Sequence, residues 1–388
     1  GLQYSQTKEK SPLMTSLEII EKKVFETFCH TVSYKSFMQS VEMADLLKKR
    51  GYQVTYLGLK AEETLQVAAV LFSLPMTGGP HMEINSGPVS RDKQYLKQFY
   101  QELQSYAKEN GALEVLFKPY DTYQHFDTTG QPTDQENTAL LDDFLSLGYQ
   151  HDGLLTGYPG GEPDWHYVKD LTDLDEKTLL KSFSKKGRPL VKKAKTFGIT
   201  LRKLNRDELP LFKEITSATS DRRDYDDKSL DYYQDFYDSF GDSCEFMVTS
   251  LNFQDYLAHL ETDKAKLDKR IEKLRTAIEN NNFSEKKQNQ LRELSSQSAT
   301  FDTRMAEAKE FIGKYGSQNV VLAGSLFVYT KQEAVYLFSG SYPEFNKFYA
   351  PALLQEYVML EAIKRGITTY NLLGITGEFD GSDGVLRF

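Results

Sequence analysis

Residues 53–74 have the sequence QVTYLGLKAEETLQVAAVLFSL, and this stretch decides the fold class. Its segments 53–59 and 65–74 are short runs rich in apolar and β-branched residues, a composition typical of strands. The segment Pro75–Pro80 follows with prolines and glycines, which end an extended segment. We therefore predict two strands here, and the neighbouring segments supply the helices that cover them.

Helical and extended segments alternate on both sides of these strands. Residues 92–110 form an amphipathic pattern that Asn110 and Gly111 close, which predicts a helix. The other elements predicted in this part are helices at 17–50 (with a break near 31–36) and 134–147, and strands at 82–89 and 113–118. One sheet with covering helices is therefore expected across residues 17–150, an α/β or α+β arrangement.

A stretch rich in glycine and proline at 153–164 marks a predicted domain boundary. It separates a first domain at 17–163 from a second at 164–388, and residues 1–16 are expected to be a tail. The second domain repeats the alternation in architecture, without recognisable sequence identity to the first. Its predicted strands lie at 166–171, 199–204, 244–251, 320–329, 334–339 and 368–374, and its helices at 176–183, 207–219, 229–239 and 350–365.

Residues 254–316 interrupt the second domain with a different pattern. Apolar residues recur there in steps of 7, 4, 3 and 4 at Leu260, Leu267, Ile271, Leu274 and Ile278. After a polar turn at 279–287, similar steps return. One heptad seam on each of two helices predicts an antiparallel coiled-coil hairpin about 40 Å long at ~1.5 Å per residue. Its many Lys and Glu side chains fit either a solvated surface or an arm that contacts a large partner.

The composition excludes several classes of protein. The chain has 388 residues with a net charge of −9, which excludes a globally basic nucleic-acid coat protein but not a local basic patch. Cys29 and Cys244 cannot form a disulfide framework or a zinc site, and the scattered histidines have no metal-ligand spacing. No apolar run is long enough to span a membrane. We therefore expect a cytoplasmic protein with neither a metal nor a DNA partner.

The usual catalytic motifs are absent from the sequence. It contains no GxGxxG, GxxxxGK[ST], HExxH or GxSxG, and no convincing pair of nucleophile and base. If the protein is an enzyme, we expect the nucleophile to belong to the substrate.

One segment is strongly basic in this acidic chain. Its cations, which have few acidic neighbours, are Lys185, Lys186, Arg188, Lys192 and Lys193. Such a cluster attracts phosphate groups. The alternative is a basic helix that only faces solvent.

Several short segments, in a fixed order, are similar to a known family. They are Ser36-Phe37-Met38-Gln39-Ser40, Ser86-Gly87-Pro88-Val89, 182–198, Tyr336-Leu337-Phe338-Ser339-Gly340-Ser341, Phe348-Tyr349-Ala350-Pro351, Tyr370-Asn371-Leu372-Leu373-Gly374 and Gly384-Val385-Leu386-Arg387-Phe388. With the hairpin in the second half, the chain resembles the Fem family of non-ribosomal peptidyltransferases, which use aminoacyl-tRNA to build the cross-bridge of peptidoglycan. It looks closest to the streptococcal MurM/MurN type.

The resemblance implies a fold and a reaction. The fold would be two GNAT-like domains, the type found in acyl-CoA N-acyltransferases, with a cleft between them and the coiled-coil hairpin inserted in the second. The donor would be alanyl-, seryl- or glycyl-tRNA, which is a co-substrate, so no cofactor is implied. The acceptor would be lipid II or UDP-MurNAc-pentapeptide. The basic segment would bind the tRNA backbone or phosphates at the inner face of the membrane, where the protein would make peripheral contact.

The resemblance also assigns roles to single residues. Lys48 and Lys228 correspond to two cations that contact the pyrophosphate of the acceptor, with Lys228 four residues before Tyr232. Lysine keeps the charge of the family's arginine at 228 but not its bidentate geometry. Phe338 replaces a tyrosine that contacts the acceptor. Phe388 begins the family's Phe-Lys pair, whose lysine is tied to the tRNA end and to catalysis and would be the next residue.

A family aspartate that precedes a proline is replaced here by Lys118, next to Pro119, so its role as a base does not transfer. The last residues, 384–388, resemble the middle of a strand, and we expect the natural chain to continue.

Two other functions are compatible with the same sequence. The first is an ordinary acyl-CoA-dependent GNAT N-acyltransferase, which needs a pyrophosphate-binding loop of the type R/Q-x-x-G-x-G/A, and the sequence has no such loop. The second is a non-catalytic binding protein whose coiled coil engages a partner. Acetyl-CoA turnover without tRNA would favour the first, and a lack of any transfer would favour the second.

Overall fold

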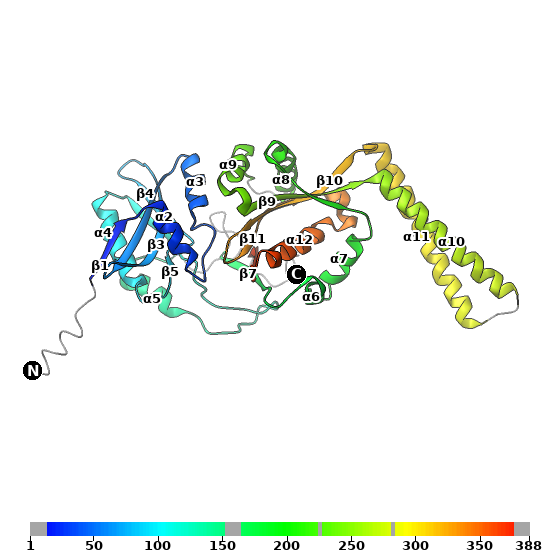
Figure 1. The fold of residues 1–388 in the computed structure, drawn as a ribbon, viewed down its shortest axis with the longest axis horizontal. Helices are drawn as coiled ribbons and strands as arrows, with labels where there is room; N and C mark the ends of the chain where they lie inside the picture. Colours follow the sequence, from blue (N-terminus) through cyan, green and yellow to red (C-terminus); the bar gives the residue numbers. More distant parts are fainter. Residues whose placement is uncertain (1–13, 152–163, 224–226, 281–283, 376–388) are drawn as a thin grey trace, which may run out of the picture.

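A computed structural model describes residues 14–151, 164–223, 227–280 and 284–375. They form two six-stranded sheets, one after the other along the chain, and a long helical hairpin extends from the second (Figure 1). We call the first sheet with its helices the first lobe (15–146) and the second sheet with its helices the second lobe (165–375). The predicted boundary at 153–164 lies almost wholly outside the described residues.

The first sheet has the order β1-β2-β3-β4-β6, with β5 paired to β3. Its strands are β1 (Thr15–Ile19), β2 (Gln53–Ala61), β3 (Thr64–Leu74), β4 (His81–Asn85), β5 (Val89–Ser90) and β6 (Glu114–Lys118). Its helices are α2 (Lys22–His30), α3 (Val41–Lys49), α4 (Leu96–Glu109) and α5 (Thr138–Ser146). Neighbouring strands are antiparallel except β4 and β6, which are parallel.

Helices cover both faces of the first sheet, which explains the continuous apolar run in its sequence. Along β3, Val67, Ala69 and Leu71 pack against α4 and α5, whereas Ala68 and Val70 pack against α2 and α3. A strand that is buried on both faces needs apolar residues at every position rather than at alternate ones. The strands predicted from residues 53–74 are therefore present, and they lie side by side at the centre of the sheet.

The predicted helix at 17–50 is wrong at its beginning. Residues Thr15–Ile19 form strand β1, which pairs with β2 from Thr15↔Ala61 to Ile19↔Leu57. The main-chain N–H of Leu17 also donates to Glu102 of α4 at 3.1 Å. The partners that make this segment a strand come from distant parts of the chain, so local periodicity cannot reveal them. Part of the predicted tail 1–16 thus belongs to the sheet, and residues 1–13 lie outside the described part.

The second sheet has the order β7-β12-β11-β10-β9-β8. Its strands are β7 (Trp165–Asp170), β8 (Thr200–Lys203), β9 (Cys244–Asn252), β10 (Asn319–Tyr329), β11 (Ala334–Ser341) and β12 (Thr369–Ile375). The helices packed on it are α6 (Glu176–Ser182), α7 (Gly187–Ala194), α8 (Leu209–Arg223), α9 (Leu230–Phe240) and α12 (Ala350–Lys364), with short 3-10 turns at Arg206–Glu208, Gly241–Ser243 and Pro343–Phe348.

The two sheets repeat one plan. In the first, β1 to β4 are antiparallel and β6 runs parallel to β4; in the second, β8 to β11 are antiparallel and β12 runs parallel to β11. Two helices follow the first strand of each series, and one helix lies between the parallel strands. The repeated architecture that the sequence indicates is thus a repeat of strand order and direction.

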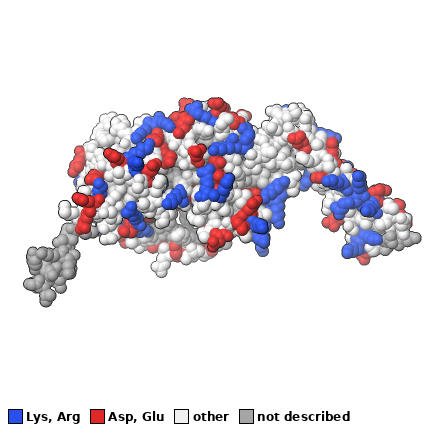
Figure 2. All heavy atoms as spheres, viewed as in Figure 1, with Lys and Arg blue, Asp and Glu red and all other residues white. Residues whose placement is uncertain are grey.

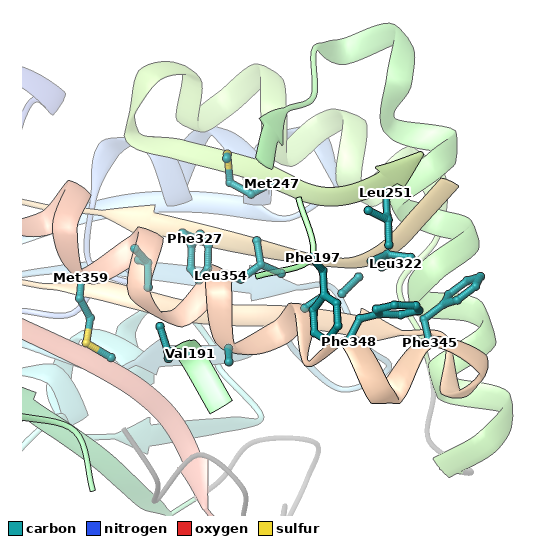
Figure 3. Packing of buried hydrophobic residues seen from close by; sticks show 14 of the residues in the cluster. Val191, Phe197, Met247, Leu251, Leu322, Phe327, Phe345, Phe348, Leu354 and Met359 are labelled. Atoms are coloured by element: carbon teal, nitrogen blue, oxygen red, sulfur yellow. The ribbon is translucent and has the colours of Figure 1, made fainter. Parts of the chain in front are cut away.

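The hairpin is an arm formed by α10 (Phe253–Glu279) and α11 (Glu285–Tyr315), inserted between β9 and β10. Its outer part has a small apolar seam of its own, with Leu267, Ile271 and Leu294 buried between the helices. Its base joins the core of the second lobe through Phe253, whose ring lies 6.0 Å from that of Phe345. Figure 3 shows Phe345 and Phe348 within this core, beside the base of the arm.

Candidate functional site

The two lobes meet where α3 of the first packs against α9 of the second (Figure 1). Phe37, Met43 and Leu46, from α3 and the residues before it, belong to the same buried cluster as the apolar residues of α8 and α9. Polar contacts continue this boundary: Lys49 Nζ donates to Ser239 Oγ at 2.9 Å, and Arg50 lies 3.2 Å from the Asp235 carboxylate. Side chains of both lobes can therefore act on one substrate here.

Three of the predicted acceptor-binding residues lie together at this boundary. The ammonium group of Lys228 lies 5.1 Å from the ring centre of Tyr232, whose ring centre is 6.3 Å from that of Phe338. Arg50 adds a guanidinium from the first lobe, 5.7 Å from the centre of the same Tyr232 ring. We call Arg50, Lys228, Tyr232 and Phe338 the boundary cluster. It offers two cations and two aromatic rings within one small region.

Lys48 does not share these contacts. Its ammonium group lies 5.7 Å from the ring centre of Tyr56, on β2 of the first sheet. The resemblance points to this helix for a cation, and the structure places Arg50, rather than Lys48, beside Tyr232. Arg50 directly follows α3, and at ~100° per residue its position lies nearly opposite that of Lys48 around the helix axis. A gapped sequence match does not distinguish the two positions.

The loop that holds Lys228 is fixed by the buried carboxylate of the preceding residue, Asp227. Asp227 accepts hydrogen bonds from Lys213 Nζ at 2.6 Å and from the Tyr233 hydroxyl at 2.8 Å. Burial acts to raise the pKa of Asp227, but the hydrogen bonds from Lys213, Tyr233 and Thr216 outweigh it and lower that pKa below its ordinary value. Lys213 also donates to the main-chain oxygen of Lys228 at 2.7 Å. The carboxylate therefore stays ionised and fixes the start of α9.

The predicted basic segment divides into two groups. Lys185, Lys186 and Lys192 are exposed on and just before α7, and Lys and Arg atoms gather over this part of the second lobe (Figure 2). Arg188 instead donates to the main-chain oxygens of Lys181 and Phe183, at 3.0 and 3.2 Å. It closes the carboxyl end of α6, where a cation is favoured by the helix dipole, and so serves the fold.

Lys193 is also exposed, and its ammonium group lies 5.3 Å from the ring centre of Tyr349, so it is held near the amino end of α12. Phe388 lies outside the described residues.

Protein nucleophiles are not evident in the described part of the chain. Cys29 and Cys244 are both buried, and burial raises the pKa of each thiol to about 12, which keeps them protonated near neutral pH. Within residues 14–151, 164–223, 227–280 and 284–375, no three His, Cys, Asp or Glu side chains gather as metal ligands. None of the helices within those ranges combines the length and apolarity needed to cross a membrane.

Two residues that sequence reasoning missed form a second feature of the boundary. Glu333 of the second lobe is buried and accepts a hydrogen bond from the Tyr120 hydroxyl of the first lobe, at 2.8 Å to its Oε1. Neither residue belongs to a recognisable motif. A charged residue in the short turn between β10 and β11 normally faces solvent, so only the docking of the lobes reveals its burial.

The fold and this boundary define a class: a two-lobed α+β protein built from two similar sheets, with cations and aromatic rings where the lobes meet. The family model described as the FemAB family matches residues 20–388. The chain therefore belongs to the FemAB family, which confirms the resemblance drawn from the sequence.

Relatives and a solved structure agree with this assignment. The chain is 28% identical to a protein of Staphylococcus epidermidis named aminoacyltransferase FemA, over 94% of this chain and 90% of the relative. It is 27% identical to the FemA of Staphylococcus aureus over 94% and 89%. A crystal structure of FemX superimposes with a TM-score of 0.72 at 20% identity, covering 95% of this chain and 91% of that one. The predicted α+β fold is confirmed, and so is the predicted class of enzyme, an aminoacyltransferase of peptidoglycan cross-bridge synthesis.

Proposed function

We propose that the protein transfers alanine, serine or glycine from aminoacyl-tRNA to the stem-peptide amine of a peptidoglycan precursor, either lipid II or UDP-MurNAc-pentapeptide. The supporting observation is the boundary cluster, where Lys228 and Arg50 lie around Tyr232. A pyrophosphate needs cations from more than one direction, and an attached sugar or peptide packs on aromatic faces. The finer assignment to the MurM/MurN type stays a prediction.

The reaction would be the aminolysis of an ester. The amine nitrogen of the acceptor attacks the carbonyl carbon of the aminoacyl ester, the C–O bond to the tRNA ribose breaks, and an amide forms. Because the ester is already activated, no covalent enzyme intermediate is needed. Holding two reactants in the attacking geometry can lower the barrier by about 7–11 kcal/mol in favourable cases, so positioning by the two lobes accounts for much of the catalysis.

The donor would be bound by the exposed lysines of the second lobe. Lys185, Lys186 and Lys192 are exposed, and their ammonium groups suit phosphates of a tRNA backbone or of a membrane surface. Arg188 is not part of this proposal, since its guanidinium bonds the end of α6. A lipid-linked acceptor would bring the protein from the cytoplasm to the inner face of the membrane as a peripheral protein.

A transfer assay tests the whole proposal. The full-length protein is mixed with one charged tRNA at a time and with lipid II or UDP-MurNAc-pentapeptide, and the acceptor mass is measured. We expect the mass of one alanyl, seryl or glycyl residue to be added. Absence of any gain with all three charged tRNAs, or transfer from acetyl-CoA without tRNA, would contradict the proposal.

Acceptor binding can be tested separately. Lys228→Ala should weaken acceptor binding on the order of tenfold, the value of one lost charge-assisted contact, as measured by calorimetry. Lys108→Ala is the matched control, because Lys108 is an exposed lysine on α4 of the first lobe. Equal affinity of the Lys228 variant and the wild type would remove Lys228 from the acceptor site.

A further inference from the structure

The turn between β10 and β11 ties the second lobe to the first. Lys331 Nζ donates to the main-chain oxygen of His30 at 3.0 Å, and Gln332 Nε2 donates to that of Val32 at 2.8 Å. Both acceptors lie at the carboxyl end of α2 or just beyond it. The next residue, Glu333, is therefore held inside the lobe junction, with only 4% of its surface exposed.

The carboxyl group of Glu333 has one hydroxyl partner across the junction. Its two oxygens lie 2.8 and 3.0 Å from the Tyr120 hydroxyl, which donates to them. Asn371 Nδ2 donates in turn to the Tyr120 oxygen at 2.9 Å. The chain of hydrogen bonds therefore runs from Asn371 through the Tyr120 hydroxyl to the Glu333 carboxyl. Tyr120 as a residue is partly exposed, and its hydroxyl contacts the buried carboxyl across the boundary between the lobes.

Other titratable groups face this pair from both lobes. The ring of Tyr34 stacks on that of Tyr120 at 5.1 Å, and Lys35, also buried, donates to Gln39 O at 3.0 Å. His166 of β7 is 6.1 Å from Tyr120, ring centre to ring centre. Burial raises the pKa of Glu333 to about 7, while hydrogen bonds from Tyr120 and Asn371 and the charge of Lys35 act in the opposite direction.

The pair lies where the second sheet opens. Strands β11 and β12 pair only through Ala334↔Tyr370 and Val335↔Asn371 in the described residues, directly after Glu333. Beyond this point β11 continues without β12 to Phe338, a member of the boundary cluster. Tyr120 therefore stands at the base of the diverging strands, on the side where the first lobe is docked.

We propose that Glu333, acting through the Tyr120 hydroxyl, accepts the proton that the attacking amine loses during transfer. This inference rests on the proposed aminolysis. It assigns a proton acceptor to a reaction for which the sequence shows no base.

The proton balance is complete. As the amine nitrogen bonds to the ester carbonyl, one N–H proton passes to the Tyr120 oxygen while the Tyr120 proton passes to a Glu333 carboxylate oxygen. When the C–O bond to the ribose breaks, the proton returns by the same route to the ribose oxygen. The enzyme ends in its starting state, and neither an oxidant nor a metal is required.

The test compares transfer rates against pH. In the wild type, kcat should fall below a midpoint near pH 7, the pKa of Glu333. Glu333→Gln should lower kcat on the order of 100-fold and remove that acid limb, while acceptor binding stays unchanged. Tyr120→Phe, which deletes only the hydroxyl, should cause a similar loss. The matched control is Glu245→Gln: Glu245 is also buried and accepts a tyrosine hydroxyl, from Tyr329 at 2.7 Å, but within the second lobe.

The possible outcomes separate failure of the proposed function from failure of the proton relay. If the wild type shows no transfer, the proposed function fails and this inference fails with it. If the wild type is active and Glu333→Gln or Tyr120→Phe keeps its rate, the relay alone is overturned. If Glu333→Gln is slow but retains the acid limb near pH 7, its role is structural and the inference is again overturned.

Discussion

The two lobes share a strand order but differ at their parallel strands. In the first lobe β4 and β6 pair along their whole length, from His81↔Glu114 to Asn85↔Lys118. In the second lobe the equivalent strands, β11 and β12, share only the pairs at 334↔370 and 335↔371 within the described residues. The first lobe is thus a closed scaffold, whereas the second is open at the place where the boundary residues lie. The same strand arrangement therefore forms a supporting scaffold in the first lobe and part of the candidate site in the second lobe.

The largest effect is expected from Gln39, which closes the first sheet. Its amide oxygen accepts from Val70 N at 2.7 Å and its amide nitrogen donates to Asn85 O at 2.7 Å, so it bridges β3 and β4 where the strands do not pair. Gln39→Ala should cost on the order of 3–4 kcal/mol of unfolding free energy in urea denaturation, because two buried main-chain groups lose their partner.

Thr219 is the comparable residue of the second lobe, since its Oγ1 accepts from Ser341 N at 3.1 Å. The same oxygen donates to Ile215 O at 3.0 Å. Thr219→Ala should cost about 1–2 kcal/mol, less than Gln39→Ala, because only one main-chain N–H loses its acceptor. Equal losses for the two variants would show that the first lobe is no more tightly closed than the second.

Glu333 should make stability depend on pH. Because its pKa is raised in the folded protein to about 7, from an ordinary value of 4.5, it stabilises the fold below pH 4.5 and loses that contribution as the pH rises through 7. Between pH 5 and pH 8 the wild type should lose about 2–3 kcal/mol relative to Glu333→Gln. Chemical denaturation of both proteins at the two pH values measures this. Parallel pH dependences would mean that the carboxyl is not buried at the junction.

Two strand glycines, one in each lobe, differ in what surrounds them. A Cβ on Gly340 of β11 would lie 2.7 Å from the main-chain oxygen of Ile215 on α8, which cannot move without shifting the helix. A Cβ on Gly58 of β2 would instead meet the side-chain ends of Leu65 and Ile20, at 2.6 and 2.9 Å. We expect Gly340→Ala to cost about 2 kcal/mol and Gly58→Ala about 1 kcal/mol, measured as shifts in thermal unfolding. The reverse order would contradict this account of packing on the two sheets.

The smallest effect on folding is expected from shortening the arm, the element that has no equivalent in the first lobe. Its outer seam of Leu267, Ile271 and Leu294 packs only within the arm among the described residues. Replacing residues 266–300, which leaves Phe301 and Arg304 in place at the second-lobe core, by a short turn should therefore change the unfolding temperature of the lobes by no more than a few degrees. The same variant decides whether the arm helps to bind tRNA: a raised KM for charged tRNA supports this, and an unchanged KM assigns the arm to solvent or to another partner.

Local sequence predicts most elements of this fold but few of its contacts. The apolar run at 53–74 and the heptads of the arm could be recognised because burial on both faces and helix pairing leave a periodic or continuous pattern. Strand β1 was missed because its partner, β2, begins more than thirty residues later. The boundary cluster could be predicted through the resemblance, except for Arg50. Glu333 and Tyr120 could not, because they are 213 residues apart and meet only when the lobes dock.

Two of the sequence motifs shared with the family contain residues that support the fold. Gln39 lies in the first of them and Gly87 in the second, and a Cβ on Gly87 would come within 2.7 Å of the Gln39 amide carbon. Glycine at 87 therefore allows the close approach that lets Gln39 close the sheet. Sequence comparison alone assigns such residues to a family without showing whether they bind substrate or support the fold.

Strand β10 connects two distant regions of the molecule. It begins at the base of the arm, where Asn252 Nδ2 donates a hydrogen bond to Ser317 O at 2.9 Å. It ends at the turn that docks on the first lobe. Eleven residues of extended chain span about 35 Å at ~3.3 Å each. The base of the arm and the turn that docks on the first lobe are therefore the two ends of a single strand.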